Sequence, residues 1–340
     1  EVSKDIQPQE LISDTIRHMA NTATKEAFDA VGVIDDLQSL GKVDDIAKRL
    51  QSDKRFKNVI KMPAMKRAVS SILEEVLANP SVMFSSLRMR SGSDGADYEH
   101  AVDTTILSIS IGQSFKYTQA ELRQLGIAAT LHDIGKIILG EMREKNDFEL
   151  NADEKMLLRE HPVYSSIILD ENEDGSYVEQ SVAMQHHEQI DGTGFPRGLC
   201  AGDLPPIKSN QKQGMIHRFA QILAVANTYD NLISGTGNGR VFTPEQAIIA
   251  IINHRAGAWN MHVVAALTRI VQCFPVGVTV KIKDNSSKRF IGYRGIISKE
   301  NREEQSKPTI ILTHNANERE IKPNMVDFAR EKAMQLMVHL

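Results

Sequence analysis

The chain has 340 residues, of which 41% are hydrophobic and 25% charged, a composition typical of a soluble globular protein with room for about two domains. Its formal net charge of −4 argues against wide coverage of a nucleic-acid backbone, so no DNA or RNA polymer is expected as a partner, whereas a small anionic ligand in a local pocket remains compatible. Only Cys200 and Cys273 occur, too few for a disulfide framework, which favours a cytoplasmic location. No apolar run approaches the roughly 20 residues that span a bilayer. The chain starts at Glu1 rather than Met, which favours a longer parent protein.

The first half of the chain is predicted to be helical. Apolar residues recur at three- and four-residue spacing over residues 10–19 and 65–77, while nothing in residues 1–90 marks a ligand. We therefore expect a regulatory or dimerising region there, acting through a homodimer or a signalling partner. Residues 90–95 are expected to form a loop and residues 98–115 a buried helix. Thr118 and Glu121 form a capping box that opens a helix running through Lys136.

The second half is predicted to change from helices to strands. A helix is expected from residue 152 to about His161, another from 181 to 187, a long loop over 188–214, and a helix over 215–232. Thr243 and Gln246 form a further capping box, with Pro244 at the first helical position. Residues 278–284, 289–298 and 309–314 are predicted strands, and a helix is expected near 323–340. The fold class is mainly α, divided into a helical region (1–90), a central domain (91–273) and a small β-rich module with a C-terminal helix (274–340).

Two short motifs concentrate metal-binding side chains. They are LHDIGK at 131–136 and QHHEQIDGTGFP at 185–196, in a chain with only 11 histidines. Imidazoles with a carboxylate suit two divalent ions that bind the oxygens of a phosphodiester and acidify a water molecule. Nitrogen and oxygen ligands without thiolate favour iron, manganese or zinc over copper(I) and leave the choice among these three open. Lys136 lies one helical turn after His132 and is expected to reach the same site.

LHDIGK, His161 in EHP, HHEQIDGTGFP and ANTYDNL resemble, in order and spacing, the HD-GYP proteins, a branch of the HD-domain metal-dependent phosphohydrolases. The resemblance covers roughly residues 85–275, and FPVG followed by short strands looks like the tail of many such proteins. It implies a helical bundle of HD-domain type that holds two or three metal ions, usually iron or manganese. The implied activity is hydrolysis of a cyclic dinucleotide, above all cyclic di-GMP, in bacterial signalling.

The resemblance also implies roles for individual residues. The metal ligands would be His100, His132, Asp133, His161, His186 and His187, and the position of the last ligand, an Asp in the family, is Asn227 here. Asp133 would bridge two metals, and Lys136 would contact the scissile phosphate. Ala96 stands where members with three metals carry a Glu, which predicts two ions at most. Phe195 replaces the tyrosine of GYP, and only Arg240 could serve in place of a basic phosphate-gripping segment.

Three functions are compatible with these motifs. The first is a cyclic-dinucleotide phosphodiesterase that forms the linear dinucleotide, with Asp133 and Lys136 as catalytic residues and Lys136 and Arg240 as substrate-binding residues. The second is a degenerate member that binds nucleotide or metal and signals through a partner, which Asn227 favours. The third is a phosphohydrolase of another substrate with the same metal core. Glu188 and Asp191 are expected either to orient the imidazoles or to stabilise the loop. The remaining histidines lack motif context and are expected at the surface or in packing: His18, His217, His254, His262, His314 and His339.

Overall fold

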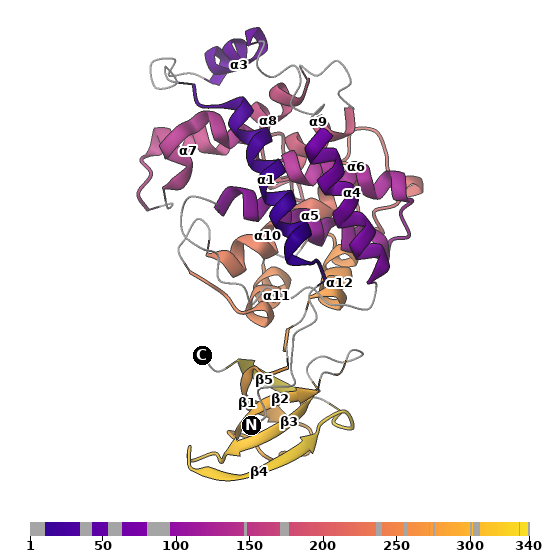
Figure 1. The fold of residues 1–340 in the computed structure, drawn as a ribbon, viewed down its shortest axis with the longest axis vertical. Coiled ribbons are helices and arrows are strands. Elements are labelled where there is room, and N and C mark those ends of the chain that lie inside the picture. Colours follow the sequence, from indigo (N-terminus) through magenta and orange to yellow (C-terminus); the bar gives the residue numbers. More distant parts are fainter. Residues whose placement is uncertain are drawn as a thin grey trace.

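The computed structural model describes residues 11–34, 43–53, 63–79, 96–145, 148–170, 177–235, 240–254, 257–271, 273–274, 276–299, 301, 307–332 and 334–338. In this part of the chain, helices occupy the region up to residue 270 and strands follow from residue 279 (Figure 1). The helices are α1 (Asp14–Val31), α3 (Val43–Ser52), α4 (Pro63–Ala78), α5 (Ala96–Ser114), α6 (Gln119–Leu131), η4 (Ile134–Glu144), α7 (Ala152–Arg159), α8 (His161–Asp170), α9 (Tyr177–Gln185), η5 (Lys208–Asn210), α10 (Arg218–Ser234), α11 (Pro244–Asn253) and α12 (Met261–Ile270). The loop predicted at residues 90–95 lies outside the described residues.

Helix α5 is the central element of the helical part, and it contacts α1, α4, α6, α10 and α12 (Figure 1). It is buried on nearly all sides because its residues are apolar or small, as the sequence predicted. Three of its buried hydroxyls are satisfied within the helix: Thr104 and Thr105 each donate to the carbonyl oxygen four residues earlier at 2.7 Å, and Ser110 does so at 2.8 Å. The buried hydroxyl of Ser108 has no hydrogen bond among the described residues.

The predicted helix starts are confirmed where side chains cap them. Thr118 and Glu121 form the capping box of α6, and Thr243 and Gln246 form that of α11, with Pro244 in its first turn. The helices expected at residues 10–19 and 65–77 overlap α1 and α4, which pack against each other. Short-range capping and apolar periodicity thus specify these elements without tertiary information.

The prediction of one α-helix through Lys136 is wrong beyond Leu131. The chain leaves the α-helix at His132 and Asp133 and continues as the 3₁₀ element η4. Close packing against α8 explains the change, because a Cβ atom on Gly135 would lie 2.4 Å from the backbone nitrogen of Ser165. The Gly135 N–H instead donates to the Ser165 hydroxyl at 2.8 Å. Residues three apart in a 3₁₀ helix are aligned, so Lys136 lies over Asp133 rather than over His132.

The helix predicted from residue 152 to about His161 corresponds to α7, which ends at Arg159. A further helix, α8, which the sequence did not predict, begins at His161 with Pro162 in its first turn. Proline is compatible with that position because the first N–H groups of a helix have no intrahelical acceptor. His161 therefore lies at the start of a helix.

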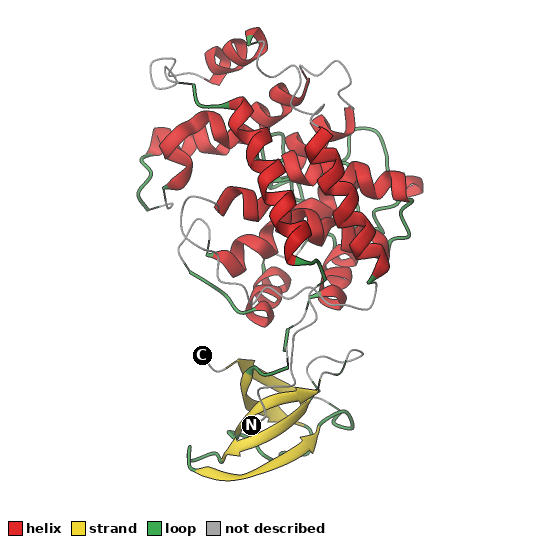
Figure 2. Cartoon of the chain, viewed as in Figure 1, coloured by secondary structure: helices red, strands yellow, loops and turns green. Residues whose placement is uncertain are grey.

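The strands form one antiparallel sheet with its own small hydrophobic core, drawn apart from the helices in Figure 2. They are β1 (Thr279–Asn285), β2 (Arg294–Lys299), β3 (Thr309–His314), β4 (Glu320–Asp327) and β5 (Met334–Val338), in the order β4-β3-β2-β1-β5. The three strands expected from alternation correspond to β1, β2 and β3 and are confirmed. Ile297, Ile310 and Leu312 point into the core of the sheet.

The helix expected near residues 323–340 is wrong, because β4 and β5 occupy that region. Pro323 lies in β4, an edge strand, where the missing N–H is tolerated. Met334 and Leu336 are buried at a spacing of two residues, and β5 pairs with β1 in register Ile282 to Leu336. Pairing with a strand about fifty residues earlier decided the conformation, and a local pattern cannot show such a partner.

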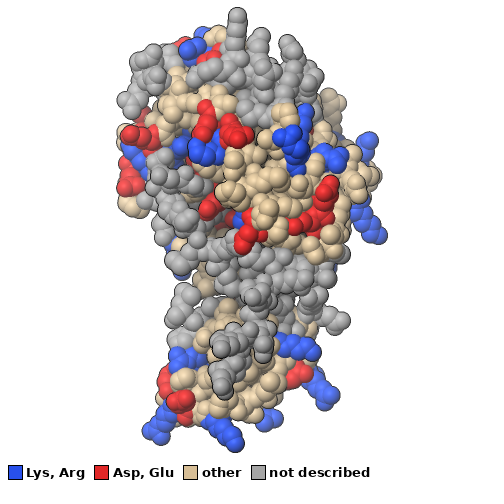
Figure 3. All heavy atoms as spheres, in the orientation of Figure 1, with Lys and Arg blue, Asp and Glu red and all other residues tan. Residues whose placement is uncertain are grey.

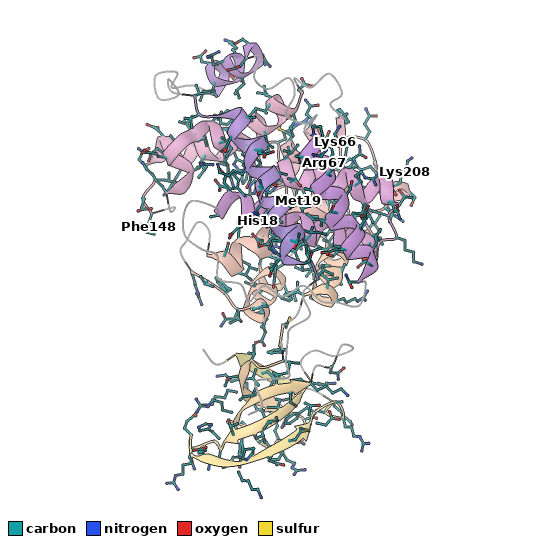
Figure 4. All side chains as sticks on the ribbon, in the orientation of Figure 1. His18, Met19, Lys66, Arg67, Phe148 and Lys208 are labelled. Carbon is teal, nitrogen blue, oxygen red and sulfur yellow. The ribbon has the colours of Figure 1, made fainter. Side chains whose placement is uncertain are left out.

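The surface of the molecule carries both charge signs. On the face drawn in Figure 3, Lys and Arg side chains are interspersed with Asp and Glu. The labelled side chains in Figure 4, which include His18 on α1, Lys66 on α4 and Phe148, are exposed. None of the helices in the described part of the chain is long and apolar enough to cross a membrane.

Candidate metal centre

Five histidines from four separate segments converge on the carboxylate of Asp133. Ligand atoms of two groups lie within 4.8 Å of one another: Asp133 with His161, His186 and His187, and Asp133 with His100 and His132. The residues come from α5, the α6–η4 junction, the start of α8 and the segment after α9. The structure thus brings together all six histidine and aspartate residues named as ligands from the sequence.

The two oxygens of Asp133 serve different histidines. Oδ1 lies 3.1 Å from Nε2 of His161 and 3.4 Å from Nε2 of His186. Oδ2 lies 3.2 Å from Nε2 of His132 and 3.5 Å from Nε2 of His100. One carboxylate therefore joins two sets of imidazoles, with one oxygen for each set, which is the arrangement of a bridging ligand between two cations.

Three of these imidazoles are oriented by the backbone. Nδ1 of His132, His161 and His186 lies 2.6, 2.6 and 2.7 Å from the carbonyl oxygen three residues earlier, which belongs to Ala129, Leu158 and Ala183 respectively. A carbonyl oxygen only accepts, so Nδ1 carries the proton and donates it, and Nε2 keeps its lone pair. These three hydrogen bonds therefore turn the Nε2 lone pairs of all three rings towards Asp133.

His100 is oriented by a side chain instead. Its Nδ1 lies 2.5 Å from Oδ2 of Asp230, and both residues are buried. A carboxylate that accepts the second N–H of a metal-binding histidine fixes the ring and makes Nε2 a stronger donor. Asp230 thus holds one imidazole in the cluster.

Several buried polar atoms of the cluster have no hydrogen bond among the described residues. They are Nε2 of His100, His132 and His187 and Oδ1 of Asp133. The Nε2 atoms of His161 and His186 are only 3.2 Å apart, although each holds a lone pair. Unpaired buried acceptors are unfavourable by themselves. Their convergence fits divalent cations, for which imidazole and carboxylate are suitable ligands.

The protonation states suit metal binding. Burial lowers the pKa of His186 to about 3, and burial together with neighbouring His186, His161 and Lys136 lowers the pKa of His187 well below its ordinary value. Burial opposes ionisation of Asp133, but His132 and Lys136 outweigh it and keep its pKa well below the usual range. At neutral pH these groups are neutral imidazoles and an anionic carboxylate, the forms that bind metal ions.

Comparison with known proteins agrees with this geometry. A protein-family model described as an HD domain matches residues 71–260, which is more than half of the chain. The chain belongs to the HD-domain family. Its resemblance to the HD-GYP branch of that family, predicted from the motifs, is confirmed by relatives named as cyclic di-GMP phosphodiesterases.

The HD-domain chain is similar to the cyclic di-GMP phosphodiesterase PA4108 of Pseudomonas aeruginosa, with 29% identity over 219 residues that cover 63% of this chain and 49% of that protein. It is also similar to the cyclic di-GMP phosphodiesterase response regulator RpfG of Xanthomonas campestris, with 28% identity over 160 residues, 47% of this chain and 39% of that protein. It spans half or less of the length of these two relatives. Among solved structures, the HDG"Y"P protein Bd1817 of Bdellovibrio bacteriovorus aligns with a TM-score of 0.48 and 19% identity over 73% of this chain and 76% of that one.

Lys136 lies beside the HD-domain cluster. Its Nζ donates to Oδ2 of Asp133 at 2.6 Å, and its side chain is partly exposed. Burial is the largest cause of the lowered pKa of both His161 and His187, and the same ammonium lowers both values further. The one basic residue of the motif is therefore close to both halves of the cluster and still accessible from outside.

The DGTGFP loop is fixed by hydrogen bonds from its backbone N–H groups to two carboxylates. Glu188 accepts from the N–H groups of Arg197 and Leu199 at 2.8 and 2.9 Å, and Asp191 accepts from the N–H of Thr193 at 3.0 Å. Glu188 and Asp191 were expected either to orient the imidazoles or to stabilise the loop. These contacts are of the kind that stabilises the loop. The loop thereby holds a fixed shape directly after His187.

Glycine is required at position 194 of this loop. A Cβ atom there would lie 2.3 Å from the backbone nitrogen of Gln189 and 2.5 Å from the carbonyl oxygen of His187. No side chain could be accommodated without moving that backbone. The close approach keeps the loop folded directly over His187.

Asn227 lies on α10, the helix whose Asp230 contacts His100. It is buried, and it precedes Asp230 by three residues, nearly one helical turn. Its Oδ1 accepts a hydrogen bond from Nδ2 of Asn231 at 2.9 Å. An amide oxygen has a second lone pair, so this bond leaves one acceptor position on Asn227.

Arg240 is exposed, and its guanidinium lies 4.6 Å from the ring centre of Phe242. Its predicted contact with the substrate stays a prediction. Of the other histidines, His18 and His262 are exposed, His217 caps α10, His254 packs on Trp259 and His314 lies in β3, whereas His339 is outside the described residues.

Proposed function

We propose that this protein is a metal-dependent phosphodiesterase that hydrolyses a cyclic dinucleotide, cyclic di-GMP first, to the linear dinucleotide. The observation that carries the proposal is the Asp133 carboxylate, whose two oxygens face separate sets of histidines. The names of the relatives support this substrate class. Two divalent ions are proposed as the cofactors, because the ligand set contains imidazole and carboxylate without thiolate. Iron or manganese is proposed from the resemblance to the HD-GYP proteins.

The donor atoms divide into two metal positions. His100, His132, Asp133 and Asn227 would hold one ion, and Asp133, His161, His186 and His187 would hold the other. When bound, such a pair supplies Lewis-acid stabilisation of the phosphoryl oxygens and an acidified nucleophilic water.

The protein's own side chains orient the ligands and balance charge. Asp133 would span both positions and set their separation. The hydrogen bonds from Nδ1 to backbone carbonyl oxygens prevent rotation of the imidazole rings. Lys136 places an ammonium beside Asp133, where charge that develops on the phosphoryl oxygens in the transition state would be stabilised. An ammonium held in place before the reaction requires no rearrangement during it.

We also propose a role for each part of the chain. Residues 91–273 would form the catalytic domain, residues 1–90 a region that regulates it or forms a homodimer, and residues 274–340 an accessory module. The sheet has a hydrophobic core of its own, which supports an independently folded module.

A second candidate is a binding module without turnover. Asn227 favours it, because a neutral amide replaces an anionic ligand and already accepts a hydrogen bond from Asn231. The site would then retain nucleotide or metal without cleaving the phosphodiester. The two candidates differ in product formation alone.

Chromatography of cyclic di-GMP incubated with metal-loaded protein tests the proposal. The protein is loaded with manganese, or with iron under reducing conditions, and the linear dinucleotide is quantified. We expect product with the wild type, none with His132→Ala, and a turnover number lowered at least about tenfold with Lys136→Ala. His18→Ala removes an exposed imidazole and is the matched control, with unchanged turnover expected.

Two outcomes would contradict the proposal. Binding of cyclic di-GMP by calorimetry without any product would select the binding module. Product that persists unchanged in both His132→Ala and Lys136→Ala would reject the site itself.

A further inference from the structure

Three side chains form a continuous stack beside the metal centre. The rings of His187 and Phe195 are nearly parallel, with centroids 4.5 Å apart and an interplanar angle of 13°. On Phe195, the guanidinium carbon of Arg159 lies 4.3 Å from the ring centroid. The stack therefore runs from a ligand of the cluster, through one aromatic ring, to a cation.

Arg159 occupies the outer end of this stack. It is exposed, Phe195 is half-buried, and His187 belongs to the cluster. Two ligand-bearing segments build the stack, since Arg159 precedes His161 by two residues and Phe195 belongs to the loop that follows His187. Among the described residues, Arg159 has no ion pair with a carboxylate within 4.0 Å.

Stacking engages only the face of the guanidinium. A cation over the face of an aromatic ring is attracted by the ring's quadrupole, which favours one orientation of the guanidinium. The N–H groups point outwards in the guanidinium plane, so stacking leaves them available. In that geometry they match the oxygens of a phosphate, which arginine binds with two parallel hydrogen bonds.

The charges of the substrate need more than one cationic group. A cyclic dinucleotide carries two phosphodiesters on one ring, and only one of them is cleaved at a time. The proposed metal pair and Lys136 both lie at Asp133, where the cleaved phosphate would bind. The second phosphate would lie further out, as Arg159 does, with the Phe195 ring between it and His187.

We propose that Arg159 binds the phosphate of the cyclic dinucleotide that is not being cleaved, and that Phe195 is the platform that orients its guanidinium. This role rests on the proposed function and extends it to substrate recognition. It makes Arg159 a determinant of affinity for substrates with two phosphates. It assigns Arg159 no part in the bond-breaking step.

The test compares two substrates with Arg159→Ala in the full chain. For cyclic di-GMP, we expect KM and the calorimetric Kd to rise about 10- to 100-fold, as expected for loss of a charge-assisted contact, while kcat stays within about twofold. For bis(p-nitrophenyl) phosphate, which has a single phosphodiester, KM should not change. Arg159→Lys should recover part of the affinity, because the charge remains and the planar fork is lost.

Arg289→Ala is the matched control, because Arg289 also stacks on a phenylalanine, Phe290, but lies in the sheet module. It should leave both KM values unchanged. Metal content, measured by elemental analysis, should be the same in all variants.

Three outcomes would overturn the role of Arg159. One is an unchanged KM for cyclic di-GMP in Arg159→Ala while the wild type cleaves it. Another is an equal loss on both substrates, and the third is a loss of metal, since these last two would reveal a structural role. A wild type that neither binds nor cleaves cyclic dinucleotides but cleaves bis(p-nitrophenyl) phosphate would instead overturn the proposed substrate.

Discussion

Replacing Asp230 with asparagine tests how the cluster obtains its charge. The carboxylate lies 2.5 Å from Nδ1 of His100, and both groups are buried. Asparagine keeps the shape and can still accept the Nδ1–H through its oxygen, but it removes the negative charge. Loss of such a partner typically weakens metal binding about 10- to 100-fold, equivalent to about 1.4–2.8 kcal/mol.

The predicted loss is confined to one metal position. His100 and His132 form one half of the cluster. In the other half, backbone carbonyls orient His161 and His186, and His187 stacks on Phe195, contacts that Asp230→Asn does not touch. Calorimetric titration of chelator-treated protein with manganese should therefore show one site weakened and one unchanged. Glu26→Gln, which removes an exposed carboxylate on α1, is the control. Equal affinities of Asp230→Asn and the wild type at both sites would refute the reasoning.

Three further predictions concern the ligand set, the loop and a helix cap. Asn227→Asp should tighten metal binding and raise turnover, because it adds an anionic ligand; unchanged metal retention in equilibrium dialysis would place Asn227 outside the site. Gly194→Ala should lower metal affinity at His187, because the added Cβ would lie 2.3 Å from the backbone nitrogen of Gln189. Gly202→Ala is the control and should leave the affinity unchanged, because its Cβ would meet no atom closer than 3.9 Å. Equal metal content in the two variants would contradict this prediction. Burial lowers the pKa of His217 to about 4, and its Nδ1 accepts the N–H of Phe219. Because the unfolded chain binds this proton more readily, stability present at high pH is lost as pH falls from about 6.5 towards 4, by about 2 kcal/mol between pH 8 and pH 5. His217→Asn, which keeps a capping group without titrating, should lose less stability over that range in chemical denaturation, and an identical pH dependence would rule out this cap as its source.

Most members of the histidine cluster could be predicted from the sequence because they occur in short motifs. His132 with Asp133, and His186 with His187, are adjacent in the chain, so their proximity in space follows from connectivity. That His100 and His161 would lie at the same carboxylate could be predicted only from the order of the motifs along the chain.

The positioning groups were harder to predict. Asp230 lies one turn after Asn227 on α10, a spacing that could have indicated a common face, but its partner His100 is 130 residues away. Arg159 is an ordinary residue at a helix end, and its contact with Phe195 exists only in the folded chain. The 3₁₀ turn that brings Lys136 over Asp133 depends on Gly135 packing against α8, which no local pattern reveals.

The central claim is that Asp133 bridges two metal ions, and electron paramagnetic resonance of manganese-loaded protein tests it most directly. Protein freed of metal is titrated with manganese, and the spectrum is followed together with the bound metal per chain. The account predicts two ions per chain and an exchange-coupled spectrum in the wild type, which Asp133→Ala should abolish. Two bound ions with an uncoupled six-line signal, or saturation at a single ion, would contradict a carboxylate shared between two metals.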